Sequence, residues 1–144
     1  MSNDLLNMLG LMKKANAIDV GETNTGAATR GGKTRLLMLA SDASDNARSR
    51  AEGFAYGRDV VMIRLPFKKE ELSAHLGKGG CSMAAITDIG FANAFIKKLS
   101  EAFPGTYDAA RDQVAEKYVN IQRRKAEAKA HERNKKIGKR RTNI

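Results

Sequence analysis

The sequence predicts an α/β protein: a three-layer α/β/α sandwich with a four-stranded mixed sheet, followed by a C-terminal basic helical extension. Helical and strand-like segments alternate through roughly the first 100 of the 144 residues, as in a sheet covered by helices on both faces. The strand-like segments are continuous apolar runs without a polar face, which is typical of a doubly covered sheet. Nearly all the excess charge follows this alternating part.

The predicted elements begin with a helix, because Leu5, Leu9 and Met12 recur at helical spacing. The runs RLLMLA and DVVMIRL have the length and composition of buried strands, and Gly57 and Gly77 end the helices beside them. In chain order we expect a helix over 5–14, a strand over 17–20, a helix over 22–30, a strand over 35–40, a helix over 44–56, a strand over 59–65, a helix over 68–76, a strand over 82–87, a helix over 88–99 and a last helix from near Tyr107.

The last helix differs from the others. Val114, Tyr118 and Ile121 give it an apolar stripe for two turns only, and the sequence then becomes QRRKAEAKAHERNKK. We therefore expect a folded domain over 1–103 and a basic helical extension over 104–144. A helix without a buried face is marginal in water, so residues 122–144 are expected to be frayed in isolation and to order on an anionic surface.

The charge distribution points to an anionic partner. The formal net charge is +10, and residues 117–144 hold 11 of the 26 bases but only 2 of the 16 acids. The remaining residues are nearly neutral, with 15 bases and 14 acids. Nine uncompensated charges in one segment repel one another, and nucleic acid would relieve that repulsion. The alternative is a disordered tail that only increases solubility.

Several function classes are excluded by what the sequence lacks. The single Cys81 rules out a disulfide framework, and His75 and His131 have no metal-ligand spacing around them. The segment GAATRGGKT has five residues between Gly26 and Gly32, whereas a P-loop needs four, and it leads into a strand rather than a helix. No apolar run reaches membrane-spanning length. We expect a cytoplasmic, monomeric protein that is not an enzyme and needs no cofactor.

Two loops carry polar groups suited to binding. The first joins Gly21 to the start of the second helix, where free first-turn amides suit a phosphate and Thr23, Asn24 and Thr25 offer short hydrogen-bonding side chains. In the structural alternative, Thr23 or Asn24 is simply the helix N-cap. The second loop, GKGGCS over 77–82, is too rich in glycine to be only a tight turn.

Four segments resemble a known family. These are LLNMLGLMKKANAIDVGE, GGKTRLLMLASDASDNAR, VVMIRLPFKKEELSAHLGKGG and MAAITDIGFANAFIKKL, which together extend over residues 5–99. They are similar to the kink-turn-binding ribosomal protein superfamily, of the large-subunit "seven Ae" type, and most closely to its bacterial YlxQ-like branch. The stretch ASDASDNAR and the pair LPFKKEEL and AITDIGFA are its most specific parts.

The resemblance implies binding of structured RNA. Members of the superfamily place the N-terminus of the second helix against sheared G·A pairs of a kink-turn, and a hydrophobic loop before the last strand covers bulged nucleotides. Strong binders have Gly-x-Asn-Glu with a Lys three positions later. Gly21 matches that pattern, but Thr23, Asn24 and Ala27 occupy the Asn, Glu and Lys positions. Since charge-assisted hydrogen bonds are about twice as strong as neutral ones, the motif is weakened.

The sequence thus predicts an RNA-binding protein, associated with the ribosome or another structured RNA, whose cationic tail binds phosphates. The alternative is a protein–protein interaction adaptor that has lost specific RNA recognition. The predicted RNA-contacting residues are Gly21, Glu22, Thr23, Asn24, Lys33, Lys78, Gly79, Gly80 and Cys81 in the body, and Arg123, Arg124, Lys125, Lys129, Arg133, Lys135, Lys136, Lys139, Arg140 and Arg141 in the tail.

Overall fold

The protein is described by a computed structural model, and the described residues are 2–77, 79 and 81–142. Six helices and four strands alternate along them. In chain order they are α1 (Ser2–Lys14), β1 (Ile18–Val20), α2 (Glu22–Arg30), β2 (Leu36–Leu39), α3 (Asp45–Ala55), β3 (Met62–Arg64), α4 (Lys69–Leu76), β4 (Met83–Ile86), α5 (Ile89–Ala102) and α6 (Asp108–Thr142).

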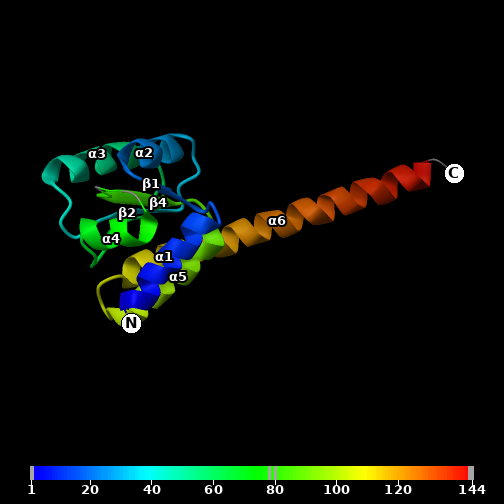
Figure 1. Cartoon of the computed structure of the whole chain (residues 1–144). Coiled ribbons are helices and arrows are strands. Elements are labelled where there is room, and N and C mark those ends of the chain that lie inside the picture. Colours follow the sequence, from blue (N-terminus) through cyan, green and yellow to red (C-terminus); the bar gives the residue numbers. More distant parts are fainter. Residues whose placement is uncertain (1, 78, 80, 143–144) are drawn as a thin grey trace.

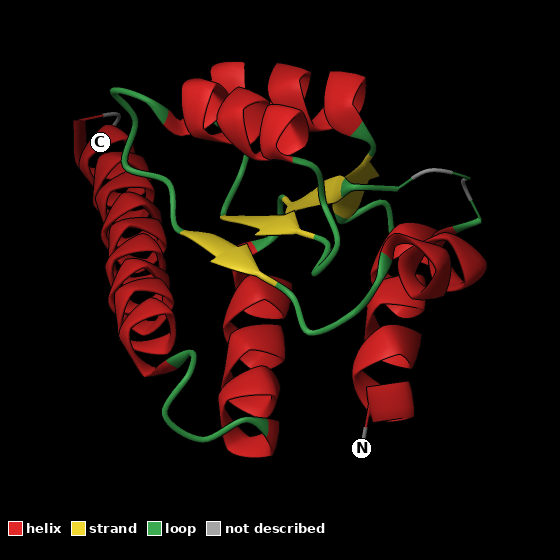
Figure 2. Ribbon diagram, turned by 90° about the vertical axis from the view of Figure 1, so that its left-hand side faces the viewer, coloured by secondary structure: helices red, strands yellow, loops and turns green. Residues whose placement is uncertain are grey.

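The four strands form one mixed sheet in the order β1-β4-β2-β3. β4 is antiparallel to both of its neighbours, whereas β2 and β3 are parallel. Helices α2 and α3 cover one face, and α1, α4 and α5 cover the other (Figures 1 and 2). The predicted three-layer sandwich is therefore confirmed, together with the mixed strand directions.

The core explains why the strands read as continuous apolar runs. Leu36 and Met38 belong to the larger cluster beneath α1, α4 and α5, while Leu37 and Leu39 pack with Ala47 of α3. Successive side chains of a strand point to opposite faces, so both faces of β2 need apolar residues. The strands are shorter than predicted, because β2 pairs over only four residues and the edge strand β3 over three.

The first half of α6 is part of the folded body. Val114 is fully buried in the core, and Tyr118 and Ile121 pack against it, as their helical spacing predicts. The Tyr107 hydroxyl donates a hydrogen bond of 2.6 Å to the carbonyl oxygen of Arg64 in β3. α6 thus lies beside the edge strand β3 (Figure 2) and protects it from pairing with another chain.

The second half of α6 forms the helical extension that the sequence predicts. The helix continues to Thr142 and projects from the body (Figure 1), whereas fraying of this segment in isolation stays a prediction. Two physical causes favour a continuous helix. The packed first half supplies the helix nucleus, whose cost is what makes isolated helices marginal, and the residues that follow are largely Ala, Glu, Lys and Arg, which are good helix formers.

Candidate nucleic-acid interface

The loop after β1 and the start of β4 lie side by side. The backbone amide of Gly21 donates a hydrogen bond of 3.0 Å to the carbonyl oxygen of Met83. Gly21 has a φ of 92°, a conformation that side chains other than glycine rarely adopt. The two loops that the sequence singled out therefore meet at one end of the sheet, although about 60 residues separate them in the chain.

The first turn of α2 presents polar groups to solvent. Its N-cap is Gly21, and no side chain caps the helix, so the alternative in which Thr23 or Asn24 is the N-cap is wrong. Both of these side chains are exposed. The Asn24 amide nitrogen donates a hydrogen bond of 3.0 Å to the carbonyl oxygen of Val20, which orients the side chain and leaves Oδ1 as an acceptor for a ligand.

The side chain of the neighbouring Glu22 forms an ion pair. Its Oε2 atom lies 2.9 Å from the Arg50 guanidinium of α3, and both side chains are well exposed. A carboxylate here repels a phosphate backbone, and the pair also holds one of the few nearby cations. Glu22 therefore stands at the predicted interface, but its charge opposes RNA binding.

The second loop is only partly described. Gly77 ends α4 with a φ of 69°, and Gly79 is exposed. Lys78 and Gly80 lie outside the described residues. Cys81 is 1% exposed and packs in the core, and its backbone amide donates a hydrogen bond of 3.3 Å to the Ser73 hydroxyl. Its side chain therefore faces the core and not a ligand.

A third segment joins the same end of the sheet. The Ala40 amide donates to the carbonyl oxygen of Ser82 at 2.9 Å, which brings the turn after β2 beside the second loop. Ser44 caps α3 at the amide of Ala47, and the Asp42 carboxylate accepts from the amide of Lys69. The sequence showed these residues only as cap and turn formers. We call this end of the sheet the loop face, defined by residues 21–24, 41–44, 79 and 81–82.

Three helices begin at the loop face. α2, α3 and α4 each follow a strand that ends there, so their first-turn amides and the positive ends of their dipoles gather on one side of the molecule. Such amides can bind phosphate oxygens without any charged side chain, and those of α2 have no side-chain cap, whereas Ala47 of α3 and Lys69 of α4 already donate to Ser44 and Asp42. The arrangement can position RNA, although the described part of the loop face lacks the charged residues of the strong kink-turn binders.

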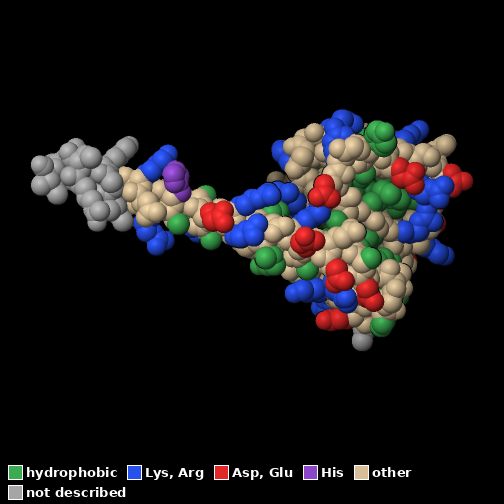
Figure 3. Space-filling model, turned by 180° about the vertical axis from the view of Figure 1, so that it is seen from behind, with side chains coloured by type: hydrophobic (Ala, Val, Ile, Leu, Met, Phe, Trp, Pro, Cys, Tyr) green, Lys and Arg blue, Asp and Glu red, His purple; other side chains and the backbone are tan. Residues whose placement is uncertain are grey.

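The remaining predicted residues lie elsewhere. Lys33 is exposed and follows the C-terminal end of α2, on the opposite end of the sheet from Gly21. Along the protruding part of α6, the described cationic side chains are all exposed, and Figure 3 shows Lys and Arg gathered there and at the junction with the body. They are Arg123, Arg124, Lys125, Lys129, Arg133 and Lys135. Lys136, Lys139, Arg140 and Arg141 continue the helix, but their side chains are outside the description.

Metal and membrane features are not found in the described part of the chain. No group of three or more His, Cys, Asp or Glu side chains comes together there in a way that could hold a metal ion. Nor does any described helix combine the length and the apolar character that crossing a membrane requires.

Comparison with known proteins identifies the family of this chain. No protein-family model matches the sequence. The protein of Bacillus subtilis (strain 168) named RNA-binding protein YlxQ is 32% identical over 96 residues, which are 64% of this chain and 91% of that protein. The chain belongs to the YlxQ family. A second YlxQ, from Enterococcus faecium, is 30% identical over 100 residues and 91% of its length is covered.

Solved structures support the fold. A Bacillus halodurans protein described as of unknown function superposes with a TM-score of 0.60 at 21% identity, covering 67% of this chain and 96% of that one. The Giardia lamblia 15.5kD RNA binding protein gives a TM-score of 0.54 at 18% identity, covering 69% of this chain and 88% of the other. About a third of this YlxQ-family chain lies outside each match, so the family core extends over less than the whole molecule.

Proposed function

We propose that this YlxQ-family protein is a non-enzymatic RNA-binding protein whose loop face contacts a kinked or looped RNA element. The observation that carries the proposal is that Gly21 of the first loop is hydrogen-bonded to Met83, the residue that directly follows the second loop, beside three helix N-termini. Relatives with 30–32% identity are named RNA-binding proteins, which supports RNA as the partner.

A bent element suits this surface better than a regular duplex. The major groove of A-form RNA is deep and narrow, so side chains as short as Thr23 and Asn24 reach base edges only where a kink opens it. Thr23, Asn24 and the amides of the loop face supply neutral donors and acceptors, and the cations of α6 add affinity for phosphates, which positions the protein without specifying a sequence. We place the protein in the cytoplasm, with ribosomal or another structured RNA as its partner.

The test is a binding titration with two RNAs, a kink-turn hairpin and a plain duplex of equal length. Asn24→Ala should weaken binding to the kink-turn about tenfold, since one good contact to a base edge contributes about 1–3 kcal/mol of discrimination. Plain-duplex binding should stay unchanged. Asn7→Ala is the matched control, because Asn7 is an exposed helical amide on α1, which covers the other face of the sheet.

Equal affinity of the wild-type protein for both RNAs would contradict recognition by the loop face. Absence of binding to either RNA, combined with capture of protein partners that persists after nuclease treatment, would instead support the adaptor function. The titration separates these two outcomes, and the nuclease step shows whether captured proteins are held through RNA.

A further inference from the structure

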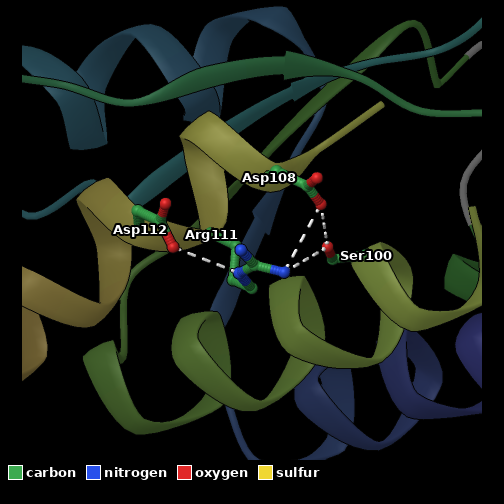
Figure 4. Close-up of polar contacts among 4 residues, drawn as sticks. All are labelled: Ser100, Asp108, Arg111 and Asp112. Carbon is green, nitrogen blue, oxygen red and sulfur yellow. Dashed lines mark hydrogen bonds and ion pairs between the residues drawn. The ribbon is translucent and has the colours of Figure 1, made fainter. Parts of the chain in front are cut away.

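The direction in which α6 leaves the body is fixed by a polar cluster at its start (Figure 4). The Arg111 guanidinium donates to the Ser100 hydroxyl of α5 at 3.1 Å and approaches Asp108 at 3.4 Å. Ser100 in turn donates to Asp108 at 2.8 Å, while the Arg111 Nε atom contacts Asp112 at 3.2 Å. With Val114 buried, these contacts attach the first turns of α6 firmly to the body.

α6 leaves the body at the end of the sheet opposite the loop face. β4 begins at Met83, beside Gly21, and ends at Ile86, whose carbonyl oxygen accepts from the amide of Arg35. Arg35 and Arg124 of α6 line the same hollow there. The protruding half of α6 then extends away from the loop face (Figure 1), so it does not fold back over it.

The junction between α6 and the body is a cationic hollow. A pocket of about 250 Å³ is lined by Arg35, Asp59, Lys117, Asn120, Ile121 and Arg124. Its one carboxylate is already paired, since Asp59 Oδ2 lies 3.0 Å from Lys117 Nζ. The two guanidinium groups therefore give the hollow an excess of positive charge, and their planar donors match phosphate oxygens. We call these two arginines and Lys117 the α6 junction.

A row of cations continues from the junction along the helix. Residues separated by 7, 11 or 18 positions return to nearly the same side of an α-helix, which places Lys117, Arg124 and Lys135 in one line. At 1.5 Å per residue the line is about 27 Å long. Lys117 is paired with Asp59, so Arg124 and Lys135 carry the uncompensated charge of this row, which suits the phosphate backbone of an extended RNA segment. No acidic residue of the described helix falls on the row, because Glu127 and Glu132 lie to either side.

We infer that the protein bridges two RNA segments, with one held at the loop face and the second anchored at the α6 junction and laid along α6. The inference rests on the proposed function, because the partner at both surfaces is RNA. It goes beyond that function in assigning two separate surfaces at opposite ends of one rigid body. The bridge brings two RNA helices, or two parts of one RNA, into a fixed arrangement.

Energy transfer between two labelled RNAs tests the bridge. The full-length protein is titrated into a donor-labelled kink-turn hairpin mixed with an acceptor-labelled plain duplex. Transfer should rise and then fall again at excess protein, because each RNA then binds its own copy. The double variant Arg35→Gln with Arg124→Gln should weaken duplex binding, lower transfer at a limiting protein concentration, and reduce the slope of log affinity against log salt for the plain duplex by about 2, one unit for each lost phosphate contact.

Lys97→Gln with Lys98→Gln is the matched control, since it removes the same charge from exposed positions of α5. The control should bridge like the wild type, and hairpin affinity should be equal in both double variants. If the wild type binds each RNA separately without transfer, the bridge is overturned while the proposed function stands. Transfer that persists at a large excess of protein reports self-association and overturns the single-chain bridge. Absence of binding to both RNAs overturns the proposed function itself.

Discussion

Replacing the five described cations on one side of the α6 extension by glutamine should strongly reduce the salt dependence of RNA binding. The five described cations of this side lie within half of the helix circumference at about 100° per residue, so one duplex can contact them together. They are Arg124, Lys125, Lys129, Arg133 and Lys135.

The expected magnitude follows from counterion release. Each phosphate contact contributes about 0.9 to the slope of log affinity against log salt, so five contacts contribute about 4.5. Between about 50 and 200 mM salt, the wild type should therefore lose about 500-fold more affinity for a duplex than the five-residue variant. Fluorescence anisotropy with a labelled duplex at several salt concentrations measures both slopes.

Arg123→Gln is the control for this prediction. Arg123 lies on the other side of the helix, where its Nε atom is 3.9 Å from the Glu127 carboxylate. Its replacement should change the slope by less than one unit, since its charge is already partly compensated. Equal slopes for the wild type and the five-residue variant would refute the role of the α6 extension in phosphate binding.

Three further changes test individual contacts. Glu22→Gln should tighten RNA binding severalfold in the same titration, because it removes a repelling carboxylate and releases Arg50. Thr25→Val should raise the free energy of unfolding by about 1 kcal/mol in urea titration, since the buried Thr25 hydroxyl has no hydrogen-bond partner. Burial raises the pKa of Tyr107 above its ordinary 10.0, so folding stability should fall as the pH rises from about 10 through that pKa, and Tyr107→Phe should remove this loss.

The controls for these changes use neighbouring groups. Thr29→Val should destabilise the protein instead, because the Thr29 hydroxyl bonds the Thr25 carbonyl oxygen and the Thr34 hydroxyl. If both Thr25→Val and Thr29→Val lower the free energy of unfolding, the interpretation of the Thr25 hydroxyl as buried and unpaired is contradicted. If Glu22→Gln leaves the affinity for RNA unchanged, the RNA phosphates do not lie near α2 and this prediction is contradicted. A wild-type stability that stays level above pH 10 would contradict the burial of the Tyr107 hydroxyl in the folded state.

The layers and the site loops could be predicted because their signals are local. Continuous apolar runs predicted a sheet covered by helices on both faces, and Gly21 with its polar neighbours indicated the start of α2. That both loops meet at one end follows from the antiparallel pairing of β1 with β4, which no local pattern reveals. The burial of Cys81 has the same origin, since its neighbours come from the core cluster beneath the sheet.

The placement of α6 was the least predictable part of the molecule. Its apolar stripe indicated packing, but the hydrogen bond from Tyr107 to Arg64 and the pairing of Lys117 with Asp59 join residues more than 40 positions apart. These contacts decide that α6 covers the β3 edge and leaves opposite the loop face. Lys33 lies past the C-terminal end of α2, at the other end of the helix from Asn24, although the two residues are only nine positions apart in the sequence.

The most direct measurement is chemical-shift mapping by NMR, in which a kink-turn RNA is titrated into isotopically labelled full-length protein. The amide signals of residues 21–24, 79 and 81–82 should shift or broaden at substoichiometric RNA and in step with one another, before the signals of α6 respond. Shifts confined to α6, with the loop face unperturbed at saturation, would contradict the claim that these loops recognise folded RNA.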